Sequence, residues 1–376
     1  MSYAKLIKVF CVITAVLTVT GCNKVDNNRE TIKEPGKTIT VIDKEEDTVK
    51  DSEKDLENEE QITPVVTVDK IDQIENANIS AWLNDETVIV SKENEALGKI
   101  TLAELADSYP KSLYLYHIHT KEYKLLKEQK DTNLGEATLS ADKKYLLYSE
   151  FTLGDPAYYV MNLDTLDTFG LKGENIAGAM SAHWAMNEVI GAAYSGDAYV
   201  ATTNGKISVI DGLEQEGLVI VRKVKDTIYF NTGFDPSLYS FQTSTKETKH
   251  LDIPDVLDVI PSPDETQMLV LQNNGNKSTL LLCDADGGIK KTIVMGAEIE
   301  GISWSADQSR IAYNLKSDAN GTTAKGLYVH DMVSSASTLI AVDTESTITA
   351  FSPSGKELLF SGWDGKKWNS SIVYFK

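Results

Sequence analysis

The pattern of hydrophobic and polar positions changes twice along this chain of 376 residues. Val9–Leu17 is almost entirely apolar, Asn23–Thr63 is mostly charged and polar, and from about Ile62 short apolar runs alternate with turn residues. Alternation of period two, broken by turns about every 8–12 positions, is typical of β-strands. The pattern therefore predicts a leader over residues 1–21, a tether without a core over 22–61 and an all-β domain over 62–376.

An internal repeat makes the all-β prediction more specific. In four places a strand is followed by a Ser-containing turn and a second strand, and these turns begin at Ser140, Ser262, Ser305 and Ser352. Ser and Asp suit tight turns because their side chains hydrogen-bond to the backbone two residues on. A second phrase, as in Leu327–Asp331, follows each turn. Together the two phrases make a four-stranded unit of about 40–50 residues, the size of a propeller blade.

The two phrases resemble the repeats of TolB-type β-propellers, in which a strand, Ser-Pro-Asp-Gly, a second strand and a later Leu-Tyr-Val-x-Asp recur. The resemblance covers about Ile62 to Lys376 and implies architecture rather than activity, because propellers serve many functions. Seven units can be counted, and they are anchored at Asp85, Asp142, Asn187, Asp226, Asp264, Asp307 and Ser354. Six blades are the alternative, since the fourth unit is short and the first carries an insertion.

The last unit runs out of chain after its third strand, Ser371–Phe375. We predict that Ile62–Val68 supplies the missing fourth strand. This arrangement would close the ring and pair an edge that is otherwise exposed.

The first residues have the organisation of a secretory signal peptide. Lys5 and Lys8 precede the apolar run, and a helix over Val9–Thr20 would reach about 18 Å, which is too short for a bilayer core of roughly 30 Å. Val19–Cys22 resembles the bacterial lipobox. This resemblance implies cleavage before Cys22 and lipid attachment to its thiol, and hence a palmitate-type anchor on the extracytoplasmic side of a bacterial cell membrane. An ordinary signal peptide with a chance cysteine is the alternative.

The tether carries 13 acidic and 7 basic residues and no aromatic residue. Such a segment buries too little apolar surface to offset the entropy lost on ordering it, so we expect a disordered tether. A solvated helix over Lys44–Gln61 is the alternative. Lipobox and acidic tether together resemble the YqgU-type lipoproteins of Gram-positive bacteria.

Charge and cysteine content exclude some classes of function. The formal net charge is −20, and only three residues are arginine: Arg29, Arg222 and Arg310. An acidic surface repels nucleic acid, and arginine is the preferred bidentate ligand of phosphate, so nucleic-acid binding is excluded. After cleavage and lipidation Cys283 is the one free cysteine, which leaves no intrachain disulfide. We expect a monomer whose stability comes from packing.

Most candidate chemical residues are explained by the repeat. His330 and Cys283 occupy the same strand position in different units, which indicates packing. His117 and His119 could share a metal, but turn capping explains them better, and Asp284–Gly288 lacks the later acidic ligand of a calcium loop. No nucleophile motif and no phosphate-binding glycine loop is present, so no catalytic residue, metal or cofactor is predicted. His183 and His250 are not well explained.

One face of the propeller carries unusual loops. The first unit inserts Glu93–Lys111, in which Thr101–Glu104 has a capping-box pattern that predicts a helix with an apolar stripe. The stripe either packs on the propeller or faces a partner. Together with hairpin turns on the same face it gives our candidate partner face: Leu102, Leu105, Tyr109, Asp155, Phe234, Asp235, Trp363 and Trp368.

The sequence favours a lipid-anchored module that binds or scaffolds a protein or a cell-wall component through this face. The alternative is a propeller hydrolase or lyase that acts on an extracytoplasmic polymer with carboxylates near the central channel. A third interpretation is a sensor domain. Binding predicts exposed aromatic residues, an enzyme predicts carboxylates or His183 in a pocket with perturbed pKa values, and a sensor predicts a closed channel of ligand size.

Overall fold

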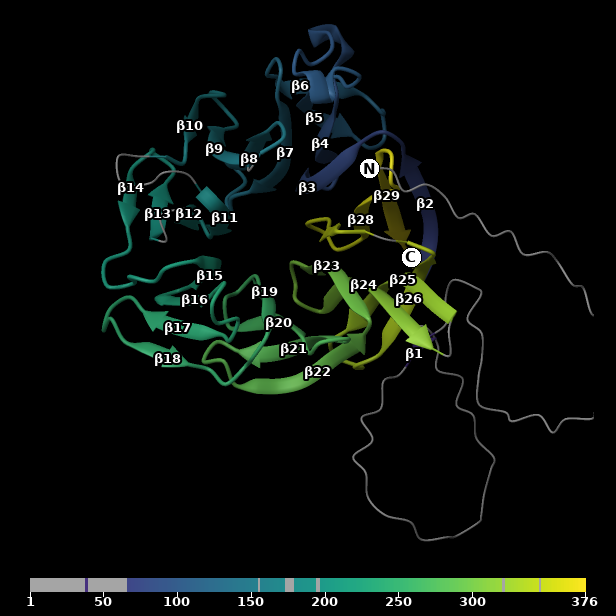
Figure 1. Cartoon of the computed structure of the whole chain (residues 1–376). Coiled ribbons are helices and arrows are strands. Elements are labelled where there is room, and N and C mark those ends of the chain that lie inside the picture. Colours follow the sequence, from purple (N-terminus) through teal and green to yellow (C-terminus); the bar gives the residue numbers. More distant parts are fainter. Residues whose placement is uncertain are drawn as a thin grey trace, which may run out of the picture. The chain divides into compact units, whose positions relative to one another are not determined.

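The computed structural model describes residues 38–39 and 66–376, apart from 155, 173–178, 194–196, 320–321 and 345. These residues form seven antiparallel sheets, which Figure 1 shows arranged in a ring. The fold is a seven-bladed β-propeller, which confirms seven units over six. The expected leader and most of the expected tether lie outside the described residues. No helix within the described part of the chain is long and apolar enough to cross a membrane.

Each of the first three blades consists of four strands that are consecutive in the sequence. Blade 1 has β3 (Asn78–Asn84), β4 (Thr87–Glu93), β5 (Lys111–His117) and β6 (Tyr123–Lys127). Blade 2 has β7 (Asn133–Leu139), β8 (Tyr145–Phe151), β9 (Ala157–Asn162) and β10 (Thr168–Gly170). Blade 3 has β11 (Ala179–Ala185), β12 (Glu188–Ala193), β13 (Ala198–Thr202) and β14 (Ile207–Val209).

Blade 4 has β15 (Leu218–Val224), β16 (Thr227–Thr232), β17 (Tyr239–Gln242) and β18 (Thr248–His250). Blade 5 has β19 (Val256–Pro261), β20 (Gln267–Asn273), β21 (Ser278–Asp284) and β22 (Ile289–Gly296). Blade 6 has β23 (Glu298–Trp304), β24 (Arg310–Ala319), β25 (Thr322–Asp331), β26 (Ser337–Val342) and a fifth strand, β1 (Thr38–Ile39). Blade 7 has β27 (Ile348–Phe351), β28 (Glu357–Trp363), β29 (Trp368–Phe375) and β2 (Val68–Ile74).

The antiparallel order gives the ring two faces. We call the face with the tight turns between the first two strands of each blade the turn face. The opposite face holds the connections between second and third strands and between consecutive blades, and we call it the loop face.

The repeated turns have the predicted chemistry. In blade 6 the Ser305 hydroxyl donates to Asp307 at 2.6 Å and accepts from the Arg310 backbone N–H at 2.9 Å. The equivalent Ser140 and Ser262 hydroxyls each donate to the Asp two residues on at 2.7 Å. These bonds hold the turn closed from within, so the Ser-x-Asp pattern encodes the turn locally.

The ring is closed as predicted, but by a strand further along the chain. β2 pairs with β29, with Val68 opposite Phe375 and Ile74 opposite Ser370. The predicted segment Ile62–Val68 therefore shares only Val68 with the observed strand. The reason is that Val68–Ile74 carries three charged residues and does not resemble a buried strand in the sequence, although as an outer strand it exposes one face.

Tryptophan side chains join neighbouring blades. The indole N–H of Trp82 in blade 1 donates to the Ala350 carbonyl of blade 7 at 2.9 Å, and that of Trp184 in blade 3 donates to Thr138 of blade 2 at 3.0 Å. The Trp304 indole of blade 6 donates to Ile260 of blade 5 at 3.3 Å. Each bond satisfies an indole N–H and ties the inner strand of one blade to that of the preceding blade.

The predicted helix in the blade 1 insertion is not formed. Glu93–Lys111 contains two short 3₁₀ turns, η1 (Glu95–Leu97) and η2 (Ala103–Leu105). The N-cap of η2 is Leu102, which has no side-chain cap, and the Thr101 N–H instead donates to Asp131 at 2.8 Å. The capping-box prediction was therefore wrong, because this contact to the next blade connection competes with helix initiation.

Candidate functional site

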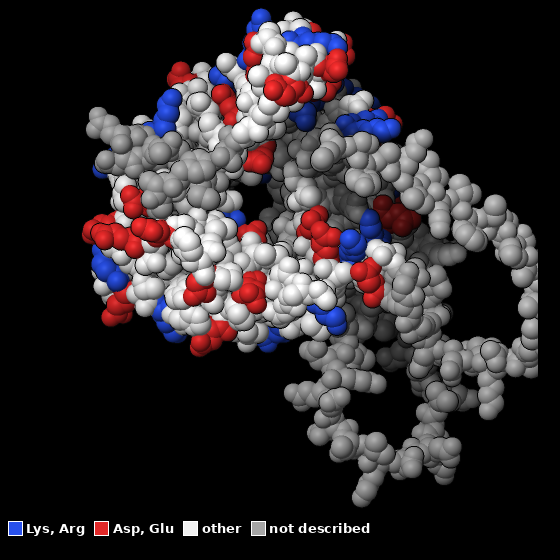
Figure 2. Space-filling view, viewed as in Figure 1, with Lys and Arg blue, Asp and Glu red and all other residues white. Residues whose placement is uncertain are grey.

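Three adjoining cavities open on the loop face over blades 5 to 7. A cavity of 230 Å³ shares Lys325, Thr344 and Trp363 with a cavity of 460 Å³ over blades 6 and 7. It also shares Glu298, Glu300 and Thr347 with a cavity of 520 Å³ between the inner strands of blades 5 and 6. Because the lining residues are shared, we treat the three cavities as one groove. Figure 2 shows acidic and basic side chains side by side around the central opening of the ring.

Two aromatic residues of β28, Phe360 and Trp363, line the groove, and Trp363 is the more exposed of the two. It lies at the end of β28 and is 46% exposed. Its ring lies 6.1 Å from the Trp368 ring across the hairpin and 6.0 Å from the Lys111 Nζ. The hairpin is held by Asp364, whose carboxylate accepts from the Lys366 and Lys367 backbone N–H groups at 2.8 and 2.9 Å. The turn chemistry therefore fixes the tryptophan at the rim with part of its ring accessible.

Two carboxylates lie side by side in the groove. Glu298 and Glu300 are two residues apart on β23 and so project from the same side of the strand. Burial of the Glu300 carboxyl raises its pKa above 4.5, and the nearby Glu298 raises it further. Lys316 Nζ lies 3.4 Å from Glu298 and opposes part of this increase. The pair can hold a proton on Glu300 at a pH where an exposed carboxyl is ionised.

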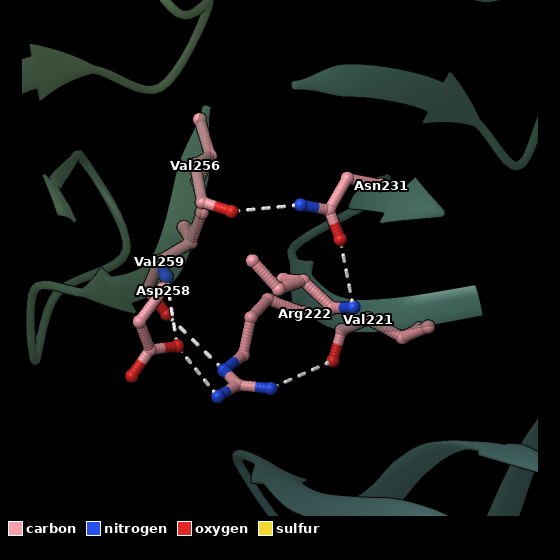
Figure 3. A network of polar contacts seen from close by, with 7 residues as sticks. Val221, Arg222, Asn231, Val256, Asp258 and Val259 are labelled. Carbon is pink, nitrogen blue, oxygen red and sulfur yellow. Dashed lines mark hydrogen bonds and ion pairs between the residues drawn. The ribbon is translucent and has the colours of Figure 1, made fainter. Parts of the chain in front are cut away.

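A second polar cluster lies on the inner strands of blades 4 and 5, and Figure 3 shows it. Arg222 is 15% exposed by its side chain, and its guanidinium donates to Asp258 at 2.7 Å and to the Val259 and Val221 carbonyls at 3.1 and 3.2 Å. Asn231 bridges the same two blades, because it accepts from the Ile220 N–H at 3.0 Å and donates to the Val256 carbonyl at 2.9 Å. These bonds fasten blade 4 to blade 5.

Asp258 connects this cluster with the groove, since it also lines the cavity of 520 Å³. His183, on the inner strand of blade 3, is placed nearby. Its burial and the charge of Arg222 together hold the pKa of His183 well below 6.5. His183 is therefore a neutral side chain beside an arginine at neutral pH.

The residues of the candidate partner face fall into several environments. Phe234 is 84% exposed and Leu102 is 39% exposed, whereas Leu105, Tyr109 and Trp368 are half-buried. Asp235 holds its own turn, because its carboxylate accepts from the Ser237 N–H at 2.9 Å and from the Tyr239 hydroxyl at 2.6 Å. Asp155 lies outside the described residues. Of this set, Trp363 lines the groove, while Phe234 lies on blade 4 and Leu102 on blade 1.

The packing interpretation of the buried residues is confirmed. His330 is buried and hydrogen-bonds to the Ser337 hydroxyl at 2.9 Å, and burial with the charge of Lys291 lowers its pKa to about 4. Cys283 is buried, and burial raises the pKa of its thiol to about 12. A thiol with so high a pKa is a packing group rather than a nucleophile.

The polar turns also behave as predicted. His117 accepts from the Thr120 N–H at 3.2 Å, and Asp284 accepts from the Asp286 and Gly288 N–H groups at 3.0 and 2.8 Å. No three His, Cys, Asp or Glu side chains in the described part of the chain converge as metal ligands.

The sequence did not identify the groove. Glu298 and Glu300 lie on β23, Lys316 lies on β24 and Lys325 lies on β25. Their convergence with Trp363 depends on how blades 6 and 7 pack. The one available signal was Trp363 in an Asp-Gly hairpin.

Comparisons with known proteins identify the fold. An oligogalacturonate lyase in complex with manganese has 13% sequence identity and a TM-score of 0.59, over 81% of this chain and 91% of the other. Oligogalacturonate lyase from Vibrio parahaemolyticus has 10% identity and a TM-score of 0.62, over 82% and 97%. TolB from Acinetobacter baumannii has 14% identity and a TM-score of 0.47, over 78% and 65%.

Similarity at these identities shows the β-propeller fold alone. No family model and no curated protein matches the chain. The manganese of the first lyase has no counterpart in the donor set here, because no three suitable side chains converge among the described residues.

Proposed function

We propose that this protein is a lipid-anchored extracytoplasmic propeller whose groove binds a glycan of the cell wall. The observation that carries the proposal is Trp363, a half-exposed tryptophan held at the rim of an open groove with both polar and apolar lining residues. A tryptophan face can stack on the C–H face of a sugar ring, while neighbouring carboxylates, amides and hydroxyls hydrogen-bond to the sugar hydroxyls.

The lining of the groove combines polar groups with apolar side chains such as Phe360 and Leu315, a mixture that suits the hydroxyls and the C–H faces of sugar rings. Beside Trp363 it offers Thr344, Thr347, Asn314 and charged side chains of both signs. Protein interfaces are dominated by central apolar or aromatic anchors in desolvated pockets, whereas the exposed Phe234 lies on blade 4, outside the groove.

The point where the chain enters the propeller is compatible with this orientation. Val68 pairs with Phe375, whose N–H donates to the Lys356 carbonyl in the tight turn of blade 7. The N-terminal segment therefore joins the propeller at the turn face, opposite the groove. Lipidation of Cys22, as in the YqgU-type lipoproteins that the sequence resembles, would leave the loop face directed away from the anchor.

Binding of purified cell-wall material by the soluble protein tests the proposal. Trp363→Ala should weaken binding to cell-wall sacculi at least tenfold with an unchanged melting temperature. Met186→Ala, which removes an exposed apolar side chain from a tight turn of blade 3, is the matched control and should bind normally. Equal binding by both variants, or a discrete crosslinked protein partner in place of glycan, would contradict the proposal.

The anchor is tested separately. Cys22→Ala should leave an unprocessed precursor that no longer incorporates labelled fatty acid in cells. Labelling that persists in this variant would refute lipidation at Cys22 and leave the groove proposal intact.

A hydrolase or lyase acting on the same polymer is the alternative function, and Glu300 favours it. A carboxyl with a raised pKa beside a second carboxylate is suited to proton transfer. The enzyme function would be established if the parent protein released new reducing ends from the bound glycan and Glu300→Gln bound the glycan without releasing them. Binding without release of reducing ends would support the binding module.

A further inference from the structure

Blade 6 differs from the other blades in having a fifth strand. β1 pairs with β26 antiparallel, with Thr38 opposite Thr338 and Ile39 opposite Ser337. Among the described residues the other six sheets have four strands. A segment of the expected tether therefore lies along the outer edge of the propeller (Figure 1).

Among the outer strands of the seven blades, β26 has the least protected edge. Exposed edge strands are usually protected by charged side chains or by being very short. The outer strands β2, β6, β18 and β22 all contain lysine, and β10 and β14 have three residues each. β26 has six residues, Ser-Thr-Leu-Ile-Ala-Val, and no charge. Without a partner it would present an uncharged template for pairing with another chain.

The sequence that begins at β1 has a composition that suits this edge. Thr38–Ile42 is a run of five β-branched residues, Thr-Ile-Thr-Val-Ile, within a segment that is otherwise rich in Asp, Glu and Lys. β-branched residues favour extended strands. Main-chain pairing on a sheet edge requires this conformation and little else.

We propose that Thr38–Ile39 is a docking strand that pairs with Ser337 and Thr338 at the start of the β26 edge and divides the tether into two spans. The docked position lies at the first residues of β26, next to the connection that begins after Asp331 at the turn face. β2 also begins at the turn face, on the neighbouring blade 7, so one chain segment can reach both edges.

The consequence for an anchored protein is a shorter reach, a step that rests on the lipid attachment proposed above. From Cys22 to Val68 there are 46 residue steps, which extended span at most about 155 Å. From Cys22 to Thr38 there are 16 steps, which span at most about 55 Å. Docking therefore confines the groove to ligands near the membrane, and undocking extends its range about threefold.

A disulfide-trapping experiment on the chain from residue 22, with Cys22→Ser, tests the docking without any lipid. Directly opposed residues of an antiparallel pair have Cα atoms about 4.5–5.5 Å apart, within the range that a disulfide bridges. The pair Thr38→Cys/Thr338→Cys should therefore form an intrachain disulfide rapidly under mild oxidation. Cys283 is buried and serves as an internal unreactive thiol.

Thr31→Cys/Thr338→Cys and Thr48→Cys/Thr338→Cys are matched controls, because each places a thiol elsewhere in the same tether. We expect them to crosslink at least tenfold more slowly. Equal rates for the three pairs would overturn the proposal, and so would disulfide-linked dimers in place of intrachain crosslinks. In a second measurement Ile39→Pro, which cannot donate to the ladder, should accelerate hydrogen exchange of β26 and of no other outer strand. Unchanged exchange of β26 would likewise contradict docking.

Discussion

The turn face and the loop face of this propeller are built on different principles. On the turn face the same side-chain bonds recur, with a Ser hydroxyl donating to an Asp at 2.6–2.7 Å in blades 2, 5 and 6. On the loop face lies the groove with Trp363, Glu298 and Glu300, which is built from blades 5 to 7 alone. Structural residues are thus repeated from blade to blade, whereas candidate functional residues occur once.

Loss of the closing strand should have the largest effect, because both faces depend on it. Deleting residues 66–74 would expose the edge of β29 and remove the buried Val66 side chain. We therefore expect loss of the cooperative unfolding transition. Circular dichroism during heating measures this. Deletion of Val25–Glu60 should shift the melting temperature by only a few degrees, and equal behaviour of the two deletions would refute closure by β2.

Within an intact ring, the turn face should be the more sensitive face. Ser305→Ala removes the buried hydroxyl that accepts from the Arg310 N–H, which should lower the free energy of unfolding by about 1–3 kcal/mol. Phe234→Ala on the loop face removes a larger but exposed side chain and should change the free energy of unfolding by less than about 0.5 kcal/mol. Urea denaturation measures both free energies of unfolding. A greater loss of stability in Phe234→Ala than in Ser305→Ala would contradict the prediction that the turn face is more sensitive.

Titratable groups near the two faces should change the folding stability with pH in opposite directions. The first of these groups is His330, near the turn face. The native pKa of His330 is lowered to about 4, whereas an unfolded histidine titrates near 6.5. Between these values the unfolded chain binds the extra proton, so stability falls as the pH is lowered from about 6.5 to 4. His330→Gln should flatten this part of a stability–pH curve, and His119→Gln, which alters an exposed histidine, should leave it unchanged.

Glu300 at the groove should give the smallest effect, with the opposite sign. The native pKa of Glu300 is raised above 4.5, the value expected in the unfolded chain. The folded state therefore binds the Glu300 proton more tightly than the unfolded state does, and folding stability falls as the pH rises through the native pKa. Glu300→Gln should therefore melt at a higher temperature than the parent at pH 7 and at the same temperature at pH 4. An exposed control, Glu95→Gln, should show no such difference; a lower melting temperature of Glu300→Gln at pH 7 would contradict the prediction.

The two faces were also unequally predictable from the sequence. The Ser-x-Asp turns are local, because donor and acceptor are two residues apart, and with the weaker copies of the repeat they predicted seven units, with six as the alternative. The insertion Glu93–Lys111 was predicted as a helix and forms 3₁₀ turns, since Thr101 is held by Asp131, 30 residues on.

The polar clusters between blades had no local signal. Arg222 meets Asp258 from the next blade, 36 residues away, and sequence spacing does not show which residues of neighbouring inner strands face each other. For the tether the signal was present: the β-branched run Thr38–Ile42 interrupts a charged segment. The average composition of the tether, which is dominated by Asp, Glu and Lys, hides this run.

The closing strand also determines how the molecule would bear a mechanical load. β2 runs antiparallel to β29 from Val68 at the turn face to Ile74 near the loop face, with six residues paired across the two strands. Once Thr38–Ile39 has left the edge of β26, a ligand held at the loop face and an anchor attached through the N-terminus would pull nearly parallel to these strands. The hydrogen bonds would then be strained together in shear instead of breaking one after another by peeling. Placing attachment and groove on opposite faces thus directs tension along the strongest axis of the closing blade.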